Sequence, residues 1–157
     1  MTTLSVGDAA PDFDLATSEG PNLSLADFTG RRFVLYSYPK AGTPGCAMQA
    51  NDFRDASDAF EAAGYAIIGI SPDQPAALGR FAEDLNLDFT LLSDPDHAVL
   101  EAYGAWGEHE LFGRKVISTI RSFFVVEADS KLALVEYSVK APGSVARLAE
   151  KLGVAWP

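Results

Sequence analysis

The sequence predicts an α/β fold in which helices cover both faces of a sheet. Several short runs are almost continuously apolar and rich in β-branched and aromatic residues, as strands buried on both faces require. Segments with apolar residues at helical spacing separate these runs. The order is strand, helix, strand, helix, strand, helix, hairpin, helix, and this alternation predicts a three-layer α/β sandwich.

The expected strands are short and end at turn-forming residues. They cover residues 32–38, 65–71, 88–93, 121–128 and 131–139. The first strand, RFVLYSY, stops at Pro39, which cannot donate to a strand ladder. The last two form a hairpin that turns at Asp129-Ser130. The first 31 residues hold two further strand-like pieces, DFDLAT and NLSL, which we expect to form an N-terminal β extension on the sandwich.

The four expected helices begin at residues that favour a helix start. In the first, Thr43 suits the N-cap and Pro44 the first turn, while Gly64 suits a left-handed end. In the third, Asp94 is the expected cap and Pro95 lies in the first turn. The second helix begins near Gln74 and the last near Ser144.

Length and charge restrict the classes of function. The 157 residues, 48% of them hydrophobic, fit one domain over 1–157 that needs no disulfide. A net charge of −10 argues against a nucleic-acid partner, because phosphate binding needs clustered lysine and arginine. We find neither a run of about 20 apolar residues nor a signal peptide, so we expect no membrane partner and a cytoplasmic location. His97 and His109 have no metal-ligand spacing, so no metal is expected.

The single cysteine, Cys46, lies between an expected strand and the first turn of an expected helix, in YPKAGTPGCAMQAN. Ligand sites of open α/β sheets form at this edge. The free N–H groups and positive dipole end of the helix favour a thiolate over a thiol. Thr43 can offer its hydroxyl to the sulfur or to a substrate oxygen, and Pro39 and Pro44 stiffen the loop.

Two other interpretations of Cys46 remain open from these residues. Free cysteine is among the most buried residue types, so this thiol could serve only in packing. It could also be the remnant of a redox pair whose second cysteine has been lost. A C-x-x-C motif is absent, because Ala47, Met48 and Gln49 follow Cys46.

The segment YPKAGTPGCAMQANDFRD resembles the active-site segment of the peroxiredoxins, most closely in the bacterioferritin comigratory protein, or PrxQ, branch. The family pattern of proline, threonine and cysteine falls on Pro39, Thr43 and Cys46. The resemblance continues in GDAAPDFDL, in ISPDQPAALGRFAEDLNLDFTLLSDPD and in YGAWGEHELFGRKVISTIRSFFVVEAD, and so covers nearly the whole chain. It implies a thioredoxin-like fold with an N-terminal addition.

The resemblance also implies a thiol-dependent peroxidase that needs no cofactor. Cys46 would attack a hydroperoxide, either hydrogen peroxide or an organic one, and would be left as a sulfenic acid. By the same resemblance, Thr43 would hydrogen-bond the peroxide and Pro39 would shield the pocket. Arg121, in IRSFFVV, matches the arginine that polarises the bound peroxide, which agrees with the need to stabilise charge on the leaving oxygen.

The chain departs from the branch where many members carry a resolving cysteine, five residues after the peroxidatic one. That position holds Asn51, and the next expected helix has no cysteine either. We therefore expect a 1-Cys enzyme, monomeric or dimeric, whose sulfenic acid is reduced by thioredoxin, glutaredoxin or a small thiol. A long-lived sulfenic acid is also open to overoxidation. The alternative function is a peroxide sensor that relays oxidation to a partner thiol.

Overall fold

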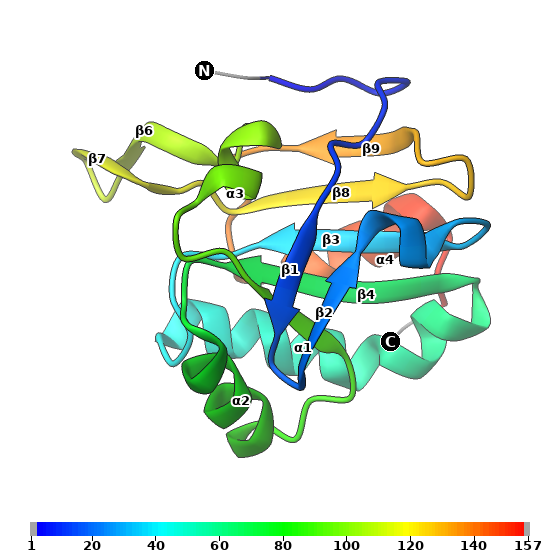
Figure 1. Ribbon diagram of the computed structural model, residues 1–157, viewed down its shortest axis with the longest axis horizontal. Coiled ribbons are helices and arrows are strands. Elements are labelled where there is room, and N and C mark those ends of the chain that lie inside the picture. The colour runs from blue at the N-terminus through cyan, green and yellow to red at the C-terminus, as the bar shows by residue number, and fades with distance from the viewer. Residues whose placement is uncertain (1–2, 156–157) are drawn as a thin grey trace.

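A mixed sheet forms the middle layer of the structure, a computed structural model that describes residues 3–155 (Figure 1). Within these residues its strands are β1 (Asp14–Thr17), β2 (Gly20–Ser24), β3 (Arg32–Ser37), β4 (Tyr65–Ser71), β5 (Thr90–Ser93), β8 (Ser122–Val126) and β9 (Leu132–Glu136). Their spatial order is β2-β1-β5-β4-β3-β8-β9. β3, β4 and β5 are parallel, whereas β8 runs antiparallel to β3 and to β9. The expected strands and the hairpin at Asp129-Ser130 are confirmed.

Two apolar cores lie on opposite faces of this sheet. One core packs under α1 (Pro44–Ala62), α2 (Pro75–Asp84) and α4 (Ser144–Leu152). The other packs under α3 (Ala98–Ala102), the 3₁₀ turn Leu25–Phe28 and the N-terminal segment. Successive side chains of a strand point to opposite faces, so a single apolar run such as β3 supplies both cores. The three-layer sandwich is confirmed.

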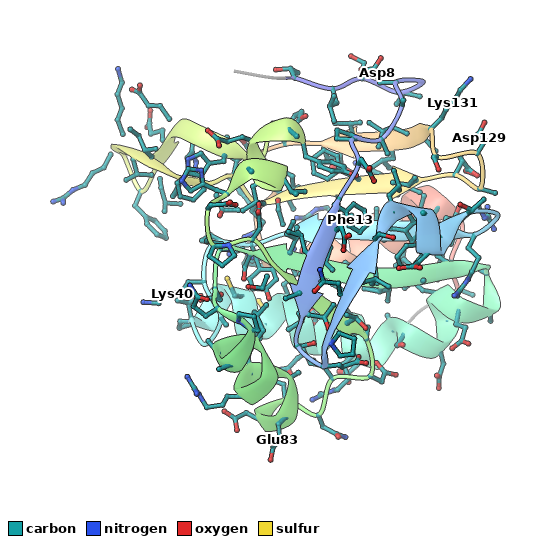
Figure 2. The ribbon with its side chains drawn as sticks, in the orientation of Figure 1. Asp8, Phe13, Lys40, Glu83, Asp129 and Lys131 are labelled. Atoms are coloured by element: carbon teal, nitrogen blue, oxygen red, sulfur yellow. The ribbon has the colours of Figure 1, made fainter. Side chains whose placement is uncertain are left out.

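The N-terminal β extension is also confirmed. β1 pairs antiparallel with β2 and joins the main sheet through β5, where Thr17 is opposite Leu92. Phe13, labelled in Figure 2, packs edge-on against Phe33 with ring centroids 6.3 Å apart. This contact seals the end of the second core, so the extension is part of the packed fold.

Both ends of α1 lie where the capping residues in the sequence predicted them. Thr43 occupies the N-cap with extended backbone angles, and Pro44 is the first helical residue. Gly64 has a φ of +92°, and a Cβ there would lie 2.8 Å from an Arg32 guanidinium nitrogen. That same guanidinium donates to the carbonyl of Ala63, so glycine both ends the helix and makes room for the arginine that caps it.

The third helix begins later than expected. Asp94 is followed by a turn at Pro95 and Asp96, His97 takes a left-handed conformation, and α3 starts only at Ala98. The N-cap is His97, so the prediction of Asp94 as the N-cap was wrong by three residues. Its buried carboxylate still accepts the N–H of Leu100 at 2.8 Å, and burial raises the pKa of Asp94. The carboxylate thus caps the helix from outside it.

A second hairpin was not predicted. β6 (Trp106–Leu111) and β7 (Arg114–Thr119) form a two-stranded sheet that projects from the body of the molecule (Figure 1). Its charged residues interrupt the apolar runs by which the other strands were found. Phe112-Gly113 is a two-residue turn between two segments in which polar and apolar residues alternate. This pattern could have indicated a β-hairpin. Among residues 3–155, no helix combines the length and the apolar character needed to cross a membrane.

Candidate active site

Cys46 lies in the first turn of α1, at the carboxyl end of the parallel strands. Its side chain is 2% exposed and its thiol is free. The loop that leads to it leaves β3 through Tyr38, whose N–H donates to Ile70 of the adjacent strand. The first turn of α1 contains no acidic residue, so nothing there neutralises the positive end of the helix dipole. The thiol therefore lies where a negative charge on sulfur is favoured.

Arg121 directly faces this sulfur. Its Nη2 lies 3.4 Å from Cys46 Sγ, although the two residues are 75 positions apart in the chain. The sheet explains the approach: β8 pairs with β3 so that Ser122 is opposite Ser37, and Arg121 immediately precedes Ser122. The structure therefore brings together the cysteine and the arginine that the resemblance singled out.

A chain of hydrogen bonds fixes the orientation of Arg121. Its Nη1 donates to Gln49 Oε1 at 2.8 Å, and Gln49 Nε2 donates to Ser144 Oγ at 3.1 Å. The Ser144 hydroxyl in turn donates to Ala141 O at 2.9 Å, so its oxygen can only accept from the glutamine. Both Gln49 and Ser144 are buried. Each bond has one direction, and the carbonyl of Gln49 must face the guanidinium.

Thr43 borders the same first turn but does not cap it as expected. Among the described residues, its hydroxyl donates at 2.8 Å to the carbonyl of Lys40, and its oxygen accepts no N–H of α1. Threonine hydroxyls often turn back to a local carbonyl in this way. The lone pairs of Thr43 Oγ1 can still accept a hydrogen bond from a donor such as a substrate O–H. Lys40 itself is exposed at the edge of the molecule (Figure 2).

Asp73 holds the loop that carries Pro39 and Thr43. Its Oδ2 accepts the N–H of Ala41 at 2.7 Å and the hydroxyl of Ser71 at 2.8 Å. Pro39 lies half-buried between this anchor and β3. The carboxylate ties the active-site loop to the end of β4, so the loop is fixed at both of its ends.

Aromatic side chains form the inner wall of the site. Tyr36 and Tyr38 are fully buried and stack with centroids 5.4 Å apart. Burial raises the pKa of Tyr36 well above its usual value, and the neighbouring Tyr38 and Cys46 add to that rise while the charge of Arg121 opposes it. This phenol therefore stays neutral, and Arg121 is the cation that faces the sulfur.

Sequence reasoning missed three residues that shape this site: Gln49, Ser144 and Asp73. Gln49 is three residues after Cys46 and so shares its helix face, and a glutamine among the apolar residues of that face was a usable signal. Asp73 follows a buried strand at the edge where sites form. Ser144 had no such signal, because α4 is remote in sequence. Over residues 3–155, no cluster of three or more metal-ligating side chains occurs.

Replacing Gln49 by leucine is expected to lower kcat/KM for hydrogen peroxide about 10-fold to 100-fold. The variant leaves Arg121 Nη1 without its acceptor, so the guanidinium is no longer held in place at the sulfur. Gln49→Glu keeps an acceptor oxygen and should retain more activity than Gln49→Leu. Steady-state peroxide consumption at equal folded protein checks this, and equal loss in both variants would contradict a positioning role.

Comparison with known proteins agrees with this geometry. Residues 6–135 match the model of the AhpC/TSA family. A protein named as a peroxiredoxin of Mycobacterium tuberculosis, strain CDC 1551, is 50% identical over 153 residues, covering 98% of both chains. Peroxiredoxin Bcp of Escherichia coli K12 is 46% identical over 132 residues, covering 84% of this chain and 85% of that protein.

Solved structures extend the likeness to the whole fold. PrxQ of Xylella fastidiosa, in a mutant form, superposes with a TM-score of 0.89 at 26% identity and covers 98% of each chain. The bacterioferritin comigratory protein of Xanthomonas campestris, studied for its alkyl peroxide reduction activity, gives a TM-score of 0.86 at 29% identity over 96% of each chain. The thioredoxin-like fold is thereby confirmed. The chain belongs to the AhpC/TSA family and is a peroxiredoxin of the Bcp/PrxQ type, a thiol-dependent peroxidase.

Proposed function

We propose that this chain is a one-cysteine peroxidase in which Cys46 reduces hydrogen peroxide and organic hydroperoxides. The observation that carries the proposal is the 3.4 Å approach of Arg121 Nη2 to Cys46 Sγ at the start of α1. A fixed guanidinium and a helix N-terminus both stabilise a thiolate, which is the nucleophilic form of cysteine. The packing role left open for Cys46 would require neither feature.

The chemical step moves two electrons from sulfur to the peroxide. The Cys46 thiolate attacks one oxygen of ROOH, an S–O bond forms, and the O–O bond breaks. The leaving oxygen takes up a proton and departs as ROH, or as water when R is hydrogen. Cys46 remains as the sulfenic acid. Arg121 stabilises the negative charge that develops on the leaving oxygen, and the fixed position of its guanidinium avoids reorganisation during the step.

The other motif residues have supporting roles in this proposal. Thr43 Oγ1 gives its hydrogen to Lys40 O, so it can accept the O–H of the hydroperoxide and orient the substrate. Pro39, held in the loop that Asp73 anchors, shields the sulfur from water. The buried Tyr36 and Tyr38 close the site from the inside.

The sulfenic acid requires a thiol from outside the chain. Asn51 stands where many relatives carry a resolving cysteine, and Cys46 is the only cysteine in the 157 residues. Joining two copies through Cys46 would require two sulfurs that are each 2% exposed to meet. We propose that one domain, residues 1–157 (of which the structure describes 3–155), carries the peroxide step in the cytoplasm, where thiol reductants are abundant.

Consumption of hydroperoxide with dithiothreitol as the only thiol tests the proposal. We expect consumption of hydrogen peroxide and of cumene hydroperoxide at rates proportional to protein concentration. The alkyl peroxide reduction activity of the Xanthomonas campestris relative supports the second substrate. Consumption no faster than with dithiothreitol alone would contradict the proposal. Oxidation of Cys46 without turnover by simple thiols would instead favour the peroxide sensor.

A further inference from the structure

The tip of the β6–β7 hairpin exposes two neighbouring apolar side chains. Phe112 is 96% exposed and Leu111 42%. We call these two residues the tip patch. The hairpin pairs only with itself in the described part of the chain and projects beyond the main sheet (Figure 1). Exposed apolar side chains gathered at one projecting point are typical of a contact surface.

Phe112 is also held in an unfavourable backbone conformation. It has a φ of +52° and is followed by Gly113 with a φ of +78°. Positive φ at both central residues is the signature of a type I′ hairpin turn, in which asparagine, aspartate or glycine is preferred at the first position. A bulky residue with positive φ is strained. Phenylalanine here carries the cost of strain and the cost of exposure, and neither is offset by packing within the hairpin.

We propose that the tip patch is the docking surface for a dithiol protein that reduces Cys46. The inference rests on the proposed function, which requires an external thiol. The redox steps balance: the partner's first thiol attacks the Cys46 sulfenic acid, a mixed disulfide forms and water leaves. The partner's second thiol then attacks the mixed disulfide, which frees the Cys46 thiolate and leaves the partner oxidised by two electrons to its own disulfide.

The hairpin is linked closely enough to the active site to serve in this way. β7 ends at Thr119, two residues before Arg121, whose side chain contacts the sulfur. Six residue pairs separate that end from the tip, which at about 3.3 Å per residue is roughly 20 Å. A partner domain of about 100 residues has a radius of gyration near 13 Å, so it can contact both places at once. In the common view of the two figures, the hairpin and the Lys40 loop lie on the same side.

Area and charge favour a transient partner over a second copy of this chain. One exposed aromatic and one partly exposed aliphatic side chain offer on the order of 250 Å², about a third of what each partner buries in a stable complex. Weak redox encounters lie in this smaller range. Two copies that each carry a charge of −10 would repel each other. The hairpin carries no net charge from its four charged side chains, so it does not repel a charged partner: Glu108, Glu110, Arg114 and Lys115.

The test measures peroxide turnover with two protein reductants, thioredoxin with its reductase and glutaredoxin with its glutathione system, and separately with dithiothreitol. For the protein that supports turnover, Phe112→Asn should raise its KM about tenfold, because one central aromatic carries much of a small interface. Activity with dithiothreitol should not change. The thermal midpoint should stay the same or rise, since asparagine suits the turn. Leu111→Thr should raise the same KM by a smaller factor.

Val6→Thr is the matched control, because Val6 is also apolar and 66% exposed but lies in the N-terminal segment. It should leave every parameter at the wild-type value. An unchanged KM in Phe112→Asn, or an equal rise in Val6→Thr, would overturn the proposal. So would wild-type turnover with neither protein faster than with dithiothreitol, or a wild-type dimer that Phe112→Asn dissociates in sedimentation. Loss of activity with dithiothreitol in the wild type would contradict the peroxidase itself rather than the docking surface.

Discussion

Cys46→Ser is expected to abolish hydroperoxide consumption, reducing it to the rate of the thiol alone. Serine keeps the size of the side chain and can still accept a hydrogen bond from Arg121. Its hydroxyl does not ionise near neutral pH and cannot form a sulfenic acid, so the electron-donating step is lost. The assay is the loss of hydrogen peroxide with dithiothreitol in excess.

The control for Cys46→Ser is the thermal midpoint, which should change little because the substitution is nearly isosteric. A folded Cys46→Ser protein that still consumes peroxide at a tenth of the wild-type rate or more would show that another group reacts. That result would leave Cys46 with the packing role that the sequence alone could not exclude.

Replacing Arg121 by methionine is the second large effect. Removing one preorganised donor from a developing negative charge typically costs about 100-fold to 1,000-fold in rate. Arg121 contacts the sulfur, and in the proposed mechanism it stabilises the leaving oxygen, so we expect a loss in kcat/KM of that size. Stopped-flow measurement of the first turnover isolates this step from reduction by the thiol.

Arg121→Lys is the matched variant. Lysine keeps the positive charge, but its single ammonium group cannot reproduce the planar guanidinium, whose two nitrogens donate to Cys46 and to Gln49 at the same time. We expect a loss intermediate between wild type and Arg121→Met. If Arg121→Met reacts with peroxide within threefold of wild type, the guanidinium has no catalytic role and the site must be interpreted again.

The sequence predicted the layers of the fold because burial on both faces leaves a strong pattern. β3 and β8 are nearly continuous apolar runs, and α1 has clear signals at both ends. The β6–β7 hairpin left a weaker pattern, because both of its faces carry polar and charged residues. The start of α3 was predicted too early because the Asp94 carboxylate accepts the N–H of Leu100 from a position before the helix. The preference of aspartate for N-caps does not show how far from the helix the residue lies.

The residues of the candidate site also fall into those that neighbouring sequence predicts and those that only the three-dimensional structure brings together. Local physics identified Cys46 and Thr43, since the end of a strand and the start of a helix can be found from neighbouring residues. Arg121 came from the resemblance alone, because only the pairing of β8 with β3 brings it to the sulfur. The bond from Gln49 to Ser144 spans 95 positions and could be found only in three dimensions.

The most direct test of the one-cysteine account is the intact mass of the wild-type protein after one equivalent of hydrogen peroxide, with no thiol present. The account predicts a gain of one oxygen per chain, removed by dithiothreitol and absent in Cys46→Ser. A small thiol added afterwards should give the mixed disulfide at Cys46. An unchanged mass, or an oxygen that persists in Cys46→Ser, would contradict the account.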